Sequence, residues 1–241
     1  MKNQYFGDVR DLFKYDLIQH IIYNSKSLNN VLLTAMLTTD DATNEGNKFS
    51  YNKAKAGYKN SDLIGFLNSS FLKKREIKNI INYFEETEID FELITDFITN
   101  TNRKTYFQQL VNKIKNNSLN FFDPDNGLEV NNYNEKHILF DEIEIVLDKM
   151  DDASTIMIYQ HFPRVKRMDY IKKRQNEIET KLSLPCCFIS DNEVVFFFIT
   201  KTQEQQSEIA NILLTYKVKY PKLFCDSQPI NIKDKQLLLS Y

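Results

Sequence analysis

Acidic side chains are concentrated in one turn, directly after a short apolar run. The run ends at Phe122, and the next seven residues include Asp123, Asp125, Asn126 and Glu129. In an α/β protein, the residues just past the carboxyl end of a strand line the ligand crevice. The stretch therefore predicts a polar site, but it does not name the reaction.

The same turn fits two kinds of chemistry. Hard divalent cations prefer carboxylate oxygens, so Asp123, Asp125 and Glu129 are candidate ligands for Mg²⁺ or Mn²⁺. Asp123-Pro124 could equally position a hydrogen-bonding group against a substrate amine. The Asp-x-Asn-Gly order is similar to part of a calcium loop, but the remaining ligand spacing is wrong. Since Asp, Asn and Gly are also ordinary turn residues, a plain turn stays open.

A second candidate lies near the start of the chain. Apolar spacing predicts a helix over residues 8–24, and Asp8, Asp11 and Tyr15 share one of its faces, with Lys14 beside them. Asp8 suits the N-cap, where a carboxylate also interacts favourably with the helix dipole. The polar stripe could instead point into a pocket, and the sequence leaves both readings open.

Acidic residues also follow the first predicted strand. Asp40 and Asp41 come after the apolar run 31–37, where the loop of a doubly wound sheet commonly meets a cofactor. The glycine-rich loop that would approach a phosphate is absent, so a nucleotide fingerprint fails here. A solvated acidic turn is the alternative.

His161 is the histidine best placed for chemistry, because it follows the apolar run 155–159. An imidazole with a pKa near 6.5 can serve as acid, base or ligand. Arg164, Lys166 and Arg167 come next and could contact phosphates, although exposed basic residues without partners are common. No local signature supports a Ser-His-Asp or Cys-His nucleophile.

Composition limits the class of protein. The 241 residues suit a single α/β domain, and the net charge of −2 gives no overall attraction to nucleic acid. A local basic face remains compatible with that charge. The three cysteines form no metal or disulfide pattern, which is typical of a cytoplasmic protein. No signal peptide and no membrane span is predicted, and the oligomeric state stays open.

The elements that must position these residues alternate between strands and helices. We expect strands at 31–37, 119–122, 155–159, 186–189, 194–200 and 234–239, while 89–94 fits a strand or a helix. We expect helices over 8–24, 61–84, 103–117, 139–150 and 203–216, and a charged helix that begins after Arg164 and runs to about residue 182. This alternation predicts a three-layer, Rossmann-like, mostly parallel sheet. Residues 194–199 are apolar on both faces, as in a central strand. Residues 41–100, which are poor in clear strands, are expected to be a helical insertion within one domain, 1–241.

Three motifs resemble those of a widespread family of uncharacterised bacterial and phage proteins, and the resemblance covers nearly the whole chain. They are Tyr5-Phe6-Gly7-Asp8 with Asp11 and Lys14-Tyr15, Phe121-Phe122-Asp123-Pro124-Asp125-Asn126-Gly127-Leu128-Glu129, and Tyr159-Gln160-His161-Phe162-Pro163-Arg164. The resemblance implies an origin in a phage or mobile element and no particular activity.

A more distant similarity is to the adenine-N6 methyltransferases that modify large-subunit ribosomal RNA. Gly7, Asp11 and Lys14 match the N-terminal spacing of those enzymes, and Asp123-Pro124 match the first half of their Asp-Pro-Pro-Tyr motif. The similarity implies a methyltransferase-like fold, the cofactor S-adenosylmethionine and a nucleic-acid base as target.

The roles that follow are also implied by this similarity. Asp123 would accept a hydrogen bond from the target amine. The cofactor would be held by Asp40 or Asp41, with Gly7 and Asp11, and phosphates would be contacted by Arg164, Lys166 and Arg167. The chain departs from the motif where Asp125-Asn126 replace Pro-Tyr, because an acidic residue cannot stack on a flipped base as the Tyr would.

Three functions are compatible with the sequence. The leading one is S-adenosylmethionine-dependent methyl transfer to a nucleic-acid base, with Asp123, Asp125, His161 and Lys14 as the catalytic candidates. The second is a metal-dependent nuclease or phosphohydrolase that uses the carboxylates of the turn, with His161 as base and Arg164 at the phosphoryl group. The third is a binding protein without catalysis.

Overall fold

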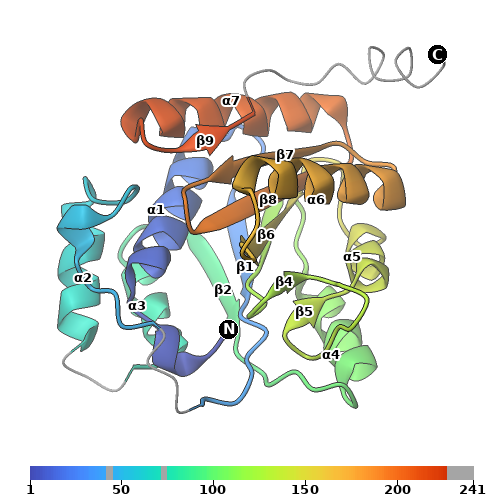
Figure 1. The fold of residues 1–241 in the computed structure, drawn as a ribbon, viewed down its shortest axis with the longest axis horizontal. Helices are drawn as coiled ribbons and strands as arrows, with labels where there is room; N and C mark the ends of the chain where they lie inside the picture. Colours follow the sequence, from blue (N-terminus) through green and yellow to red (C-terminus); the bar gives the residue numbers. More distant parts are fainter. Residues whose placement is uncertain (42–45, 72–74, 227–241) are drawn as a thin grey trace.

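The structure, a computed structural model, describes residues 1–41, 46–71 and 75–226 (Figure 1). Its helices are α1 Val9–Asn24, α2 Ser61–Phe71, α3 Ile80–Glu85, α4 Arg103–Leu110, α5 Phe140–Leu147, α6 Arg167–Leu182 and α7 Gln203–Lys219. Its strands are β1 Asn30–Thr34, β2 Asp90–Ile94, β3 Ser118–Phe122, β4 Gly127–Leu128, β5 His137–Ile138, β6 Thr155–His161, β7 Cys186–Ser190, β8 Val194–Thr200 and β9 Phe224–Cys225. Within the described residues, no helix is long and apolar enough to span a membrane.

The main sheet is mixed, with the order β2-β1-β3-β6-β8-β7-β9. The first four strands in this order are parallel, whereas β8 is antiparallel to both β6 and β7. The α/β class is confirmed, but the expected parallel arrangement holds only for β2, β1, β3 and β6. A short turn joins β7 to β8, with the carboxylate of Asp191 accepting the amides of Glu193 and Val194. Such a tight connection can join only antiparallel strands.

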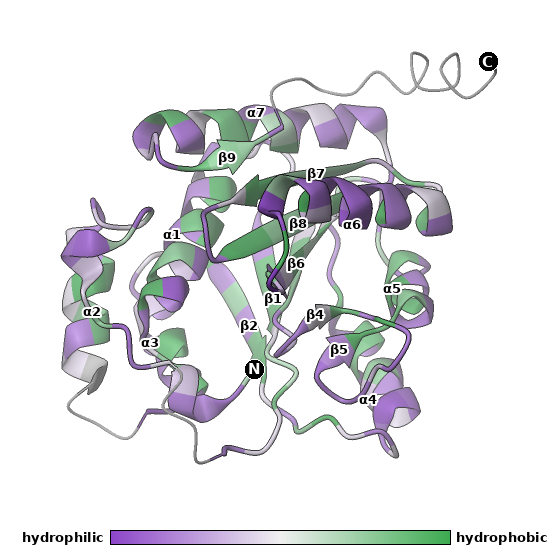
Figure 2. Cartoon of the chain, viewed as in Figure 1, coloured by the Kyte–Doolittle hydropathy of each residue, from purple (hydrophilic) through white to green (hydrophobic). Residues whose placement is uncertain are grey.

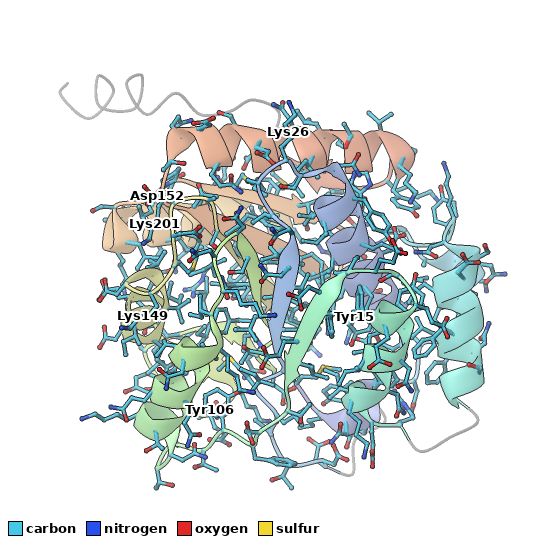
Figure 3. All side chains as sticks on the ribbon, turned by 180° about the vertical axis from the view of Figure 1, so that it is seen from behind. Tyr15, Lys26, Tyr106, Lys149, Asp152 and Lys201 are labelled. Atoms are coloured by element: carbon cyan, nitrogen blue, oxygen red, sulfur yellow. The ribbon has the colours of Figure 1, made fainter. Side chains whose placement is uncertain are left out.

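Helices cover both faces of the sheet and make two separate cores. Alternate strand residues such as Leu33 and Phe121 pack under α1, α2, α3 and α7, while Leu32 and Phe122 pack under α4, α5 and α6. Figure 2 shows the largely hydrophobic strands at the centre of the molecule, between helices that carry both hydrophobic and hydrophilic residues. Figure 3 labels one buried tyrosine from each core, Tyr15 on α1 and Tyr106 on α4.

The strand order reverses beside β1. The chain leaves β1 for β2 through α2 and α3, and then returns through α4 to place β3 on the other side of β1. Thr34 and Phe122, at the carboxyl ends of β1 and β3, are in register. This is the topological switch point at which open α/β sheets bind their ligands.

Several predicted boundaries change in the structure. The expected helix over 61–84 is two helices, because the chain is extended at Glu76. The expected helix over 103–117 ends in a 3-10 turn over Val111–Lys113. Strand β6 continues to His161, and the two-residue strands β4, β5 and β9 were not predicted. The predicted strand at 234–239 lies outside the described residues.

The segment predicted as a helical insertion contains part of the sheet. Residues 41–100 include α2, α3 and the edge strand β2, which pairs with β1 over five residues. The two helices pack on the same core as α1. This segment therefore supplies the connection that sets up the switch point.

Candidate functional site

A buried lysine joins the two motifs that were predicted separately. Lys14 Nζ on α1 lies 3.0 Å from Asp11 Oδ1 and 2.7 Å from Asp123 Oδ2, which follows β3. All three residues are at most 4% exposed. With Asp8, they form what we call the Lys14 cluster, at the switch point. Here the charged side chains of α1 meet the end of the central sheet.

The start of α1 is built to place Asp8 and Asp11. The carboxylate of Asp8 accepts the amides of Arg10 and Asp11, which confirms Asp8 as the N-cap. The amide of Gly7 donates to Asp11 Oδ2 at 2.8 Å, and the hydroxyl of Tyr51 donates to the carbonyl of Gly7. Gly7 has a φ of 89°, which favours glycine. The N-cap prediction therefore holds, whereas Tyr15, the third residue of the predicted polar stripe, is buried in the hydrophobic core.

The first residues of the chain lie across the ends of β1 and β3. The amino group of Met1 donates to the carbonyl oxygens of Met36 and Asp123 at 3.0 Å each, and it lies 3.5 Å from Asp125. Thr38 donates to the Asp125 carboxylate at 2.9 Å. As a result, Asp125 faces cations and hydroxyl donors at the edge of the Lys14 cluster.

Aromatic and imidazole groups from the end of β6 cover the cluster from the other side. Lys14 Nζ lies 4.4 Å from the centre of the Tyr159 ring, and the Tyr159 hydroxyl is 2.8 Å from His161 Nε2. These groups, with Arg10 and Asp125, surround a cavity of about 20 Å³. That volume is enough for about one water molecule.

Burial and charge shift the pKa values in the cluster. Burial raises the pKa of Asp8, Asp11 and Asp123 above the ordinary value, and the ammonium of Lys14 opposes this only in part. Burial lowers the pKa of Lys14, but Asp11 and Asp123 outweigh it, so that pKa is raised. Asp11 and Asp123 thus share one lysine, while Asp8 lies 4.0 Å from the guanidinium of Arg10 at the edge of the cluster. The cluster itself holds three carboxylates and one lysine.

Two residues next to the cluster, Asp125 and His161, have pKa values below their ordinary values. Burial raises the pKa of Asp125, but the Met1 amino group, Thr38 and Lys2 outweigh it and hold the pKa below its ordinary value. Burial, together with Arg10 and Lys14, lowers the pKa of His161 to about 3. His161 is therefore neutral at physiological pH, and it is a weak base.

The acidic turn after β3 divides into two parts. Asp123 and Asp125 face the cluster, whereas Glu129 binds the amide of Phe140 at 2.9 Å and Lys181 at 2.8 Å. Gly127 has a φ of 101°, and an added Cβ would lie 2.3 Å from the Gln160 side chain, which accepts the amide of Leu128. The second half of the turn is therefore structural.

This division bears on the predicted metal ligands. In the part of the chain that the structure describes, no three His, Cys, Asp or Glu side chains are grouped so that they could hold a metal ion. Glu129 is held by its own partners at the start of α5, while Asp123 is bound to Lys14. The three carboxylates of the turn do not converge.

The other predicted site residues lie around the cluster. The carboxylate of Asp40 accepts the amide of Gln4 at 3.3 Å, and Asp41 is bound by the side chains of Lys2 and Gln4. Beyond His161, the basic residues Arg164, Lys166 and Arg167 are exposed.

Sequence reasoning missed three members of the site. Arg10 stands at the cavity wall, 3.6 Å from Glu193 of the turn between β7 and β8. Tyr159 lies beneath Lys14, and Tyr51 binds Gly7. Arg10 stands between Asp8 and Asp11, which was the one available signal. Tyr159 is the first residue of the third motif, whereas nothing in the local pattern marks Tyr51.

Comparison of the chain with protein-family models, with curated proteins and with solved structures found no match in any of the three.

Proposed function

We propose that the chain is a methyltransferase-like protein that acts on a nucleic-acid base, and that Asp123 accepts a hydrogen bond from the exocyclic amine of that base. The observation that carries the proposal is the position of Asp123. Its carboxylate lies at the switch point, next to Pro124, and its Oδ2 atom accepts a hydrogen bond from Lys14. A buried carboxylate in this position suits an amine donor.

The strand order supports the same reading by fold-level analogy. In methyltransferase-like Rossmann folds, an antiparallel strand that comes late in the chain lies between two strands that precede it. Strand β8 lies between β6 and β7 in this way. Asp123 follows β3, which adjoins β1 on the side away from β2, and this is the side on which those folds hold the target amine.

The exposed basic residues supply a place for the nucleic-acid backbone. Arg164, Lys166 and Arg167 follow β6, the strand beside β3, so they stand near the same end of the sheet as Asp123. Lys and Arg that neutralise phosphates give a salt-dependent affinity without sequence preference. In this proposal they bind the backbone, while Asp123 reads an extruded base.

S-adenosylmethionine, the cofactor implied by a methyltransferase-like fold, would supply the methyl group. Pockets for ligands of this size measure roughly 300 Å³ or more, whereas the cavity at the strand ends measures about 20 Å³. The candidate residues Asp41, Gly7 and Asp11 are already bound by other parts of the chain. The residues as they lie do not fit the cofactor, so we derive no methyl-transfer step.

What the chain's own residues do can still be stated. Lys14 fixes the Asp123 carboxylate and opposes the rise in its pKa that burial causes. In its ionised form, Asp123 is an acceptor only. The Tyr159 ring fixes Lys14 from below. An amine that enters the small cavity would meet the Asp123 carboxylate as an acceptor that is already oriented.

The test is binding of short single-stranded RNA. We expect oligo(A) and oligo(C), whose bases carry an exocyclic amine, to bind about tenfold more tightly than oligo(U), and Asp123→Asn to remove that difference. Asp152→Asn is the matched control, because Asp152 is exposed and precedes β6 at the opposite end of the sheet (Figure 3). Equal affinity for all three oligomers, or an unaltered preference in Asp123→Asn, would refute the proposal.

A second measurement separates base binding from methyl transfer. S-adenosylhomocysteine raises the melting temperature of any protein whose native state binds it. A shift would show that the native protein binds this product of the cofactor. No shift, together with amine-dependent RNA binding, would leave a base-binding protein with a methyltransferase-like fold.

A further inference from the structure

A second cavity, of about 400 Å³, lies on the other side of Arg10 from the Lys14 cluster. Its walls are the first turns of α1, residues 47–56 and the turn between β7 and β8. Ligand pockets for small molecules start at roughly 300 Å³. The cavity is therefore large enough for a mononucleotide.

Charges of opposite sign line two sides of this cavity. Lys48, Lys53 and Lys55 stand on the wall made by residues 47–56, and Asp191 and Glu193 stand on the wall made by the β7–β8 turn. One ion pair, Lys48–Glu193 at 2.7 Å, crosses between the walls. Asp191 accepts the amides of its own turn.

Two of the lysines are available to a ligand. Within residues 1–41, 46–71 and 75–226, neither Lys53 nor Lys55 has a hydrogen-bond or ion-pair partner. Glu193 is shared by Lys48 and Arg10. Its pKa is held below the ordinary value because these cations, together with the more distant charge of Lys55, outweigh the effect of burial. The cavity therefore carries unneutralised positive charge on one side.

The floor between the charged walls is apolar. Val9, Phe13 and Ala54 line it, and Phe13 is fixed by the rings of Phe196 and Tyr216 at 4.9 and 6.1 Å. A ligand that fits has an anionic group for the lysines and a flat, largely apolar part for the floor.

We propose that this cavity binds a nucleoside monophosphate. Its phosphate contacts Lys53 and Lys55, its base lies over Phe13 and Ala54, and base amines face the carboxylate wall. This site goes beyond the proposed function, since Arg10 stands between it and Asp123 and no base at Asp123 is needed.

Isothermal titration with AMP, adenosine and inorganic phosphate tests the site. We expect AMP to bind at least tenfold more tightly than either of the other two, because only AMP engages both the lysines and the floor. The double variant Lys53→Glu/Lys55→Glu should lose at least tenfold in AMP affinity. The control Lys26→Glu changes an exposed lysine after α1, at the far end of that helix, and should bind AMP as the unaltered chain does.

Two results would overturn the proposal. One is AMP affinity that is unchanged in Lys53→Glu/Lys55→Glu while the melting temperature is also unchanged. The other is inorganic phosphate binding as tightly as AMP, which would reduce the site to an anion contact. Asp123→Asn should keep AMP binding intact, so the failure of this site and the failure of the proposed base site give different patterns.

Discussion

Two buried ion pairs lie on opposite faces of the sheet and are built differently. On the α4–α5 face, Arg103 binds both carboxylate oxygens of Glu142, at 2.7 and 2.6 Å, and also donates to the carbonyl of His137. On the α1 face, Lys14 binds one oxygen each of Asp11 and Asp123. The first pair has one cation for one anion, whereas the second has one cation for several carboxylates.

The difference separates a structural pair from a candidate site. Arg103 and Glu142 satisfy each other and connect α4, α5 and the β5 segment, with Glu142 also accepting the amide of Leu139. The Lys14 cluster has acidic groups in excess and borders a cavity. A pair with one cation and one anion is neutralised by its own members. Buried carboxylates in excess of their cation can accept a further hydrogen bond from a ligand.

The largest effect is expected from breaking the balanced pair. Arg103→Met leaves the Glu142 carboxylate buried without a cation, and loss of one partner of such a pair costs about 3–5 kcal/mol. Urea unfolding at pH 7 measures the loss. The double variant Arg103→Met/Glu142→Leu should recover most of it. A single variant within about 1 kcal/mol of the unaltered chain would contradict a structural role.

Lys14→Met should cost less and should depend on pH. It leaves Asp11 and Asp123 without the hydrogen bonds from their cation, a loss of about 2–3 kcal/mol at pH 7. Burial already raises the pKa of both carboxyls above the unfolded value, so protonation relieves the penalty as the pH falls through those raised values. Urea unfolding at pH 7 and 4.5 should show a deficit that shrinks. A constant deficit would mean that packing, not charge, is lost.

The pH dependence of stability at His161 provides a further test of the Lys14 site. Its pKa is about 3 in the folded chain, below the ordinary 6.5. Between these two values only the unfolded state binds the proton, so the free energy of unfolding decreases as the pH is lowered. The loss reaches about 2 kcal/mol by pH 5, at 1.4 kcal/mol per pH unit. His161→Asn should lack this component in denaturant titrations at pH 7 and 5. If the free energy of unfolding changed equally with pH in both proteins, the pKa of His161 would be the same in the folded and unfolded chain.

The smallest effect on stability is expected for Asp123→Asn. Lys14 keeps Asp11 as its partner, and the amide oxygen of Asn can still accept a hydrogen bond, so the loss should stay at about 1 kcal/mol. A thermal melt beside Glu142→Gln provides the contrast, because within the described part of the chain Arg103 binds no carboxylate other than that of Glu142. If Asp123→Asn were the more damaging change, the excess of carboxylates would be structural rather than available to a ligand.

The sequence was sufficient for those parts of the site that depend on local spacing. Asp8 as N-cap follows from its place before an apolar helix, and Asp123 at a strand end follows from the run before it. The contact between Lys14 and Asp123 joins residues 109 positions apart, so no periodicity reveals it. Glu129 looked like a ligand because its partners Phe140 and Lys181 come from α5 and α6, which only the fold brings near.

The same limit applies to the fold. Apolar runs located β1, β3 and β8 within a few residues, because buried strands must be apolar on both faces. These runs do not reveal the direction of a strand, so the antiparallel orientation of β8 was not predicted. The single helix expected over 61–84 is interrupted at Glu76, where Arg75 also donates to the carbonyl of Phe6, a tertiary contact that outweighs local propensity.

The placement of β8 has a consequence for how the polypeptide reaches its native state during synthesis. Strand β8 is inserted between β6 and β7, both of which emerge first, so the apolar edge of β6 has no neighbour until residues 194–200 have followed. An unpaired strand edge is a template for association with other chains. We expect nascent or truncated chains that end before β8 to aggregate, even though they contain the whole parallel half of the sheet and the Lys14 cluster.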